Sequence, residues 1–62
     1  MIIYIVQDSY DWEGYEIILI SDILEKALTI FNNHNFGDEI SIVEYNIQTQ
    51  ENKVIKSKRH EK

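Results

Sequence analysis

The 62-residue sequence carries 11 acidic and 6 basic side chains, a formal net charge of −5, and no cysteine. Disulfides and thiolate zinc sites are therefore excluded, and two histidines are too few for an all-protein zinc cage. A chain this short buries only about 60% of the surface that its unfolded form exposes, so we expect a second subunit to supplement its core.

The first two elements are predicted strands joined by a long hairpin loop. Residues 2–6 are β-branched and aromatic, and residues 15–20 have the same composition. The stretch between them, 8–14, is polar and ends in Gly14, which tolerates the positive φ of a hairpin turn. We therefore predict an antiparallel pair of strands.

A helix is predicted next. Apolar residues recur at the helical spacing i, i+3, i+4 and i+7: Leu24, Ala27, Leu28 and Phe31. Asp22, with Glu25 three residues later, has the pattern of a capping box and places acids at the positive end of the helix dipole. Residues 32–38 are rich in Asn and Gly and end the helix. His34 lies there, where an imidazolium would meet the negative end of the dipole.

Residues 39–48 are predicted as a third strand, 49–53 as a turn and 54–55 as the start of a short fourth strand. One domain would span 1–56, followed by a solvated basic tail at 57–62. Short, uncrossed connections favour an α+β fold of ββαβ(β) order. The antiparallel sheet would have three or four strands in the order 2-1-3 or 2-1-3-4, with one helix on one face.

Both faces of the first two strands are apolar, although side chains alternate between the faces of a strand. An antiparallel sheet with a solvated face would instead alternate apolar and polar residues. One helix covers only one face, so we predict a homodimer interface on the other. Its expected members are Ile2, Tyr4, Val6, Ile18 and Ile20. In the alternative interpretation, the hairpin loop or the C-terminal segment folds over this face.

The predicted hairpin loop is the candidate partner-binding site. It interleaves three acids with three aromatic side chains: Asp8, Tyr10, Asp11, Trp12, Glu13 and Tyr15. Aromatic residues dominate binding hot spots, and acids around them would steer a basic partner. The alternative is that Trp12 and the tyrosines only roof the sheet. A calcium loop is disfavoured, because Tyr10 and Trp12 occupy the third and fifth positions from Asp8, where oxygen ligands are needed.

The sequence contains no arrangement of Ser, His and acid that indicates catalysis, and no Gly-rich phosphate loop, so neither an enzyme nor a cofactor is expected. Residues 1–52 carry a net charge of −9 and residues 53–62 carry +4, which disfavours nucleic acid as the main ligand. No apolar run is long enough for a membrane helix, and no signal peptide is recognisable. We expect a cytoplasmic protein.

Four short motifs resemble a family of very small bacterial and phage proteins. They are Tyr4-Ile5-Val6, Tyr10-Asp11-Trp12-Glu13-Gly14, Glu25-Lys26-Ala27 and Ile42-Val43-Glu44-Tyr45. Members of that family open with a strand, a "YDYEG"-like turn, a second strand and a helix with a "KA" pair. This chain departs from the pattern at the helix start, where Ile23 and Leu24 intervene between Asp22 and Glu25. The resemblance implies a ββαβ fold and brings no catalytic residues.

The chain is also similar in size and charge to phage inhibitors of bacterial defence systems, including the short inhibitor of the Hachiman system. The leading hypothesis is therefore a small homodimeric interaction protein, encoded by a phage, that binds and blocks a host protein with a basic surface. It would then act in the host cytoplasm. One alternative is a regulatory module whose hairpin loop senses a small ligand. Another is an enzyme with a site of tyrosines and acids built across a dimer interface.

Overall fold

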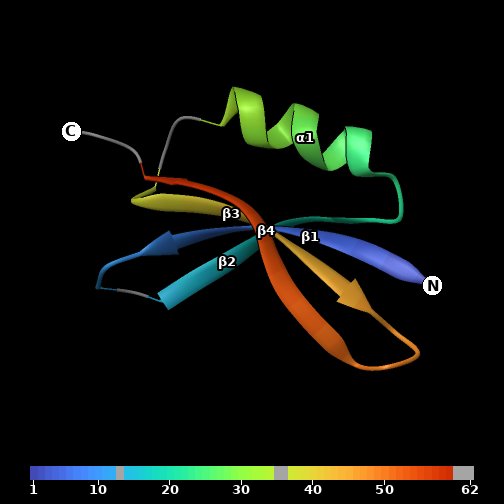
Figure 1. The fold of residues 1–62 in the computed structure, drawn as a ribbon. Coiled ribbons are helices and arrows are strands. Elements are labelled where there is room, and N and C mark those ends of the chain that lie inside the picture. Colours follow the sequence, from blue (N-terminus) through green and yellow to red (C-terminus); the bar gives the residue numbers. More distant parts are fainter. Residues whose placement is uncertain (13, 35–36, 60–62) are drawn as a thin grey trace.

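Four antiparallel strands and one helix form the domain, which we describe from a computed structural model covering residues 1–12, 14–34 and 37–59. The elements are β1 (Ile2–Tyr10), β2 (Gly14–Ser21), α1 (Leu24–Asn33), β3 (Glu39–Asn46) and β4 (Glu51–Arg59). The sheet order is β2-β1-β3-β4, and α1 lies on one side of it (Figure 1). The predicted α+β class, element order and strand order 2-1-3-4 are confirmed.

The core lies between α1 and the two central strands. Five apolar side chains are buried there: Val6, Ala27, Phe31, Ile40 and Ile42. The predicted helical stripe supplies Ala27 and Phe31, while Leu24 at the first turn is 37% exposed. Because α1 contacts β1, β2 and β3, it covers one face of the sheet, and no described segment covers the other (Figure 1). We call this uncovered side the open face.

The two ends of α1 differ from the prediction. The N-cap residue is Ile23, in an extended conformation and without a side-chain cap, so the capping box of Asp22 and Glu25 is wrong. The backbone N–H of Ile23 instead donates to the hydroxyl of Ser21 at 3.0 Å. At the other end, His34 is the C-cap, and its backbone N–H donates to the carbonyl oxygen of Ile30 at 3.0 Å.

Strands β1 and β4 are longer than predicted. Strand β1 continues to Tyr10, which places Asp8 in the sheet rather than in the loop. Strand β4 pairs with β3 over its whole length, from Glu51 opposite Asn46 to Arg59 opposite Glu39. The prediction that residues 57–59 belong to a solvated tail is therefore wrong. Pairing with β3 provides hydrogen-bond partners for the backbone of this lysine-rich segment, which has poor strand propensity. Residues 60–62 lie outside the described residues.

The strand pairing places the side chains of β1 on the faces opposite to those predicted. Val6 pairs with Leu19 and with Ile42 on the helix side and is 0% exposed. The assignment of Val6 and of Tyr4, which packs against the same core, to the uncovered face is therefore wrong. Alternation separates two sets of side chains but does not tell which set the helix covers. The open face of β1 carries the opposite set, including Ile3 and Ile5.

The other three residues expected at the interface, Ile2, Ile18 and Ile20, lie in three different environments. Ile20 pairs with Ile5 on the open face and is 56% exposed. Ile18 is the extra residue of a β-bulge, because Val6 pairs with Leu19 and the next residue of β1 pairs with Ile17. Ile2 pairs with Asn46 at the end of the sheet, on the helix side. The bulge therefore changes which residues of β2 reach the open face.

Candidate functional site

The hairpin loop between β1 and β2 presents the most exposed aromatic side chain among the described residues. Trp12 is 95% exposed and Tyr15, just inside β2, is 68% exposed. Tyr10, at the end of β1, is half-buried. Trp12 does not roof the sheet in the described structure, so that alternative is wrong for this residue. A side chain this large gains most from contact with another molecule.

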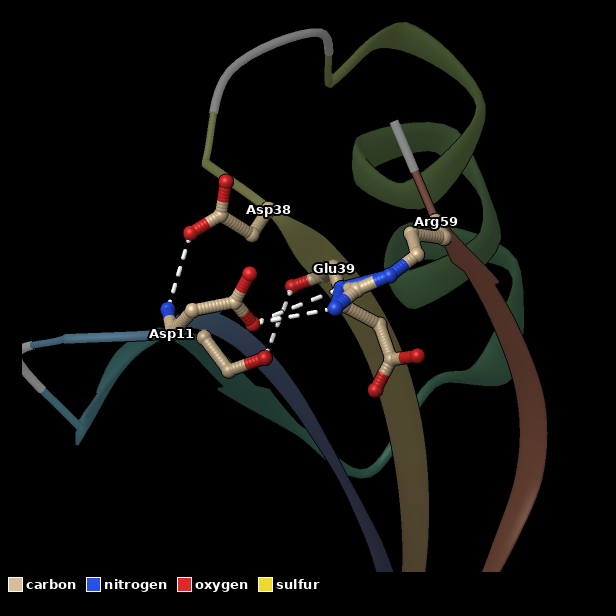
Figure 2. A network of polar contacts seen from close by, with 5 residues as sticks. Asp11, Asp38, Glu39 and Arg59 are labelled. Atoms are coloured by element: carbon tan, nitrogen blue, oxygen red, sulfur yellow. Dashed lines mark hydrogen bonds and ion pairs between the residues drawn. The ribbon is translucent and has the colours of Figure 1, made fainter. Parts of the chain in front are cut away.

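A network of polar contacts fixes the base of this loop (Figure 2). The backbone N–H of Asp11 donates to Oδ2 of Asp38 at 2.8 Å. Nη2 of Arg59 donates to Oδ1 of Asp11 at 3.0 Å and forms an ion pair with it. The backbone N–H of Asp38 donates to the carbonyl oxygen of Ser9 at 3.0 Å, and the hydroxyl of Ser9 donates to the carbonyl oxygen of Glu39 at 3.4 Å. The residue before Trp12 is thus held by the segment preceding β3 and by β4.

Two of the three acids predicted for this site, Asp8 and Asp11, do not form an acidic surface in the described structure. Asp8 is 1% exposed on the helix side of β1, so its assignment to the partner-binding surface is wrong. Asp11 is exposed, but Arg59 compensates its charge. Glu13 lies outside the described residues. The described part of the loop therefore offers aromatic surface rather than an acidic patch.

A buried acid–histidine pair lies on the helix side of the sheet. Nε2 of His34 is 3.2 Å from Oδ2 of Asp8, and the two side chains are 5% and 1% exposed. The contact has the distance of an ion pair, although neither Asp8 oxygen accepts a directed hydrogen bond from the described residues. Gly37 lies so close to Asp8 that an added Cβ would overlap the carboxylate. The pair fixes the segment after α1 against β1.

Sequence analysis missed this pair and assigned His34 only to the helix dipole. The available signal was weak: Asp8 follows Val6 at the two-residue period of a strand, which places both on one face. An acid beside a turn-rich stretch is ordinarily solvated, and nothing in the sequence connects it to a histidine 26 residues away. The pair lies inside the domain, so we assign it to stability rather than to a reaction.

A continuous apolar row crosses the open face. Four β-branched side chains, one from each strand in the order β2, β1, β3 and β4, occupy directly paired positions: Ile20, Ile5, Val43 and Val54. The two ends of the row, Ile20 and Val54, are 56% and 59% exposed. Ile5 and Val43, in the centre, are half-buried by their neighbours. We call these four residues the apolar row.

The described residues contain no group of three or more His, Cys, Asp or Glu side chains that could hold a metal ion. An open hollow of about 250 Å³ is lined by polar and charged residues of the β3–β4 hairpin. No helix in this part of the chain is long and apolar enough to cross a membrane.

Comparison of the chain with protein-family models, with curated proteins and with solved structures found no match.

Proposed function

We propose that this protein is a small homodimeric interaction module whose hairpin loop binds another protein and blocks it. The observation that carries the proposal is Trp12, which is 95% exposed beside a residue held by contacts from Asp38 and Arg59. Tryptophan is among the residues most enriched in binding hot spots. Because Asp11 is already held in place, its ordering costs less conformational entropy on binding, so more of the contact energy becomes affinity.

The loop supports recognition by aromatic contact more than by charge. Asp8 is buried and Asp11 is paired with Arg59, so steering of a basic partner falls to acids elsewhere on the domain. The choice of a bacterial defence protein as the partner rests on the similarity in size and charge to phage inhibitors of bacterial defence systems. We retain it as the class of target in which to search first.

A pull-down from bacterial lysate tests the proposal. The tagged protein should capture a specific partner at low and at moderate salt, and Trp12→Ala should lose most of it. A hot-spot tryptophan is worth at least about 2 kcal/mol, roughly a thirtyfold change in affinity. Ile47→Ala is the matched control, because Ile47 is an exposed apolar residue, 45% exposed, in the turn of the other hairpin. Capture that is equal for the wild type and Trp12→Ala would disprove the role of the loop.

The alternative function, sensing of a small ligand by the same loop, has less support. The hollow formed by the described residues lies at the β3–β4 hairpin, whereas Trp12 stands almost fully in solvent. Ligand sites are usually concave and bury most of the ligand. A metabolite panel in a thermal-shift assay would revive this alternative if one compound stabilised the wild type but not Trp12→Ala.

A further inference from the structure

The two faces of the sheet have the reverse of the usual charge distribution. On β4, three lysines point to the helix side, because Lys58 and Lys56 pair with the buried Ile40 and Ile42, and Lys53 pairs with Glu44. Nζ of Lys56 and Nζ of Lys58 lie 5.4 and 4.9 Å from the centroid of the Phe31 ring. The β4 residues that pair on the open face are mostly uncharged: Asn52, Val54, Ser57 and Arg59.

The other strands follow the same rule. On β2, Glu16 pairs with Asp8 on the helix side, while Ile17 and Ile20 pair on the open face. Among the paired positions of the open face, Glu39 and Arg59 are the charged residues, and they lie directly opposite each other at the loop end. The remaining paired positions of the open face are uncharged: the apolar row crosses them, together with polar side chains such as Gln7, Ser41 and Asn52. An exposed apolar row of this kind is a candidate contact surface.

The size of the domain agrees with an uncovered surface. The radius of gyration is 11.5 Å, against about 10.6 Å for a compact chain of this length. The accessible surface is 4583 Å², against about 4,200 Å² for a monomer of this mass. Both differences agree with the elongated shape of the domain, 38 × 22 × 15 Å, in which one face of the sheet stays exposed. The open face is therefore available for contact with another molecule.

We propose that a second copy of this chain covers it, with the two sheets packed face to face and the apolar rows at the centre of the interface. This inference rests on the proposed association of two copies and specifies how they join. Apart from Glu39 and Arg59 at the loop end, the face offers no charged paired position with which to select a charged partner, and its apolar row is complementary to itself, as a two-fold interface requires.

The area is sufficient for such a dimer. Four strands about 4.8 Å apart and eight residues long, at about 3.4 Å per residue, cover roughly 500 Å² in flat projection. Accessible surface on a pleated, side-chain-bearing face exceeds its projection, so the face approaches the roughly 800 Å² per partner of a standard stable interface. Two sheets packed in this way lie about 10 Å apart and share one core, as in a β-sandwich.

Charge substitutions at the two ends of the apolar row test the geometry. Ile20 lies on the edge strand β2 and Val54 on the opposite edge strand β4. In a two-fold dimer, only face-to-face packing places both in the same interface. Ile20→Lys and Val54→Lys should each raise the dissociation constant at least about 100-fold, because each lysine enters a symmetric interface twice. Ile47→Lys, with the same charge change at a turn residue that is 45% exposed, is the control and should stay dimeric.

Light scattering at tens of micromolar gives the readout. A dimeric wild type and control, with both row variants monomeric, supports the proposal. Sensitivity at Ile20 alone would assign the dimer to the β2 edge, sensitivity at Val54 alone would assign it to the β4 edge, and either result overturns face packing. A monomeric wild type, or two dimeric row variants, overturns it as well.

Two further measurements keep the test decisive. Circular dichroism should show native secondary structure in each variant, since both positions are more than half exposed in the single copy. If a lysine variant does not fold, Ile20→Ser and Val54→Ser repeat the comparison with a milder change. The Trp12-dependent pull-down is independent of this result: a monomer that still captures a partner refutes the dimer and leaves the loop proposal intact.

Discussion

Substitution of His34 by leucine should remove much of the stability of this domain. Nε2 of His34 and Oδ2 of Asp8 are 3.2 Å apart with side chains 5% and 1% exposed, so two polar groups are buried against each other. Removal of one partner, which leaves the other polar group buried and unpaired, costs about 1–3 kcal/mol, and more when that group is charged. A 62-residue domain has only about 3–9 kcal/mol in total.

The physical reason predicts a partial rescue. His34→Leu leaves the Asp8 carboxylate buried without its polar neighbour, and this unpaired group carries most of the cost. Asp8→Val removes the carboxylate and puts a good strand-forming residue in its place. The double variant His34→Leu/Asp8→Val should therefore be more stable than His34→Leu alone, with a coupling energy of at least about 1.5 kcal/mol.

Urea unfolding followed by circular dichroism measures the four stabilities of this double-mutant cycle. All four proteins are compared at one concentration, because the proposed dimerisation would make apparent stability depend on concentration. Additivity of the two single changes within about 0.5 kcal/mol would refute coupling between the side chains. A loss below about 1 kcal/mol for His34→Leu would show that the pair behaves like an exposed one.

Two further predictions concern the turns and the loop. Gly37→Ala should cost at least about 1.5 kcal/mol more than Gly14→Ala in urea unfolding, because both residues have φ near +85° but only at Gly37 would the new Cβ overlap the Asp8 carboxylate. Equal costs would contradict the close approach. Arg59→Ala should lower stability by no more than about 1 kcal/mol, because its ion pair with Asp11 is more than half exposed, yet it should weaken capture of the partner in the pull-down. A large stability loss with unchanged capture would show that the pair holds the sheet and not the loop.

The strand order followed from sequence because the elements and their connections were well marked. Residues 2–6 and 15–20 have strong strand composition, the helical stripe is regular, and short connections leave few topologies. The faces were harder to assign. Ile5 and Val6 are equally suited to a core, so alternation could not show which of them α1 covers. The bulge at Ile18 then changed the parity of β2, and single-sequence periodicity does not register a bulge of one residue.

Two other features depended on tertiary contacts that sequence patterns do not contain. Strand β4 has four basic residues in nine, and only pairing with β3 makes it a full strand. Burial of Asp8 depends on His34 and on the close approach of Gly37, which the fold brings together from distant positions. In both cases local propensity predicted residues exposed to solvent, whereas tertiary contacts place them in a strand or bury them.

The ion pair between Asp11 and Arg59 joins residues 48 positions apart. Arg59 lies at the end of β4, so the base of the first hairpin gains this contact only after β4 has paired with β3. A copy that lacked the end of β4 would present Trp12 beside an Asp11 without this ion pair, with a larger ordering cost for any target.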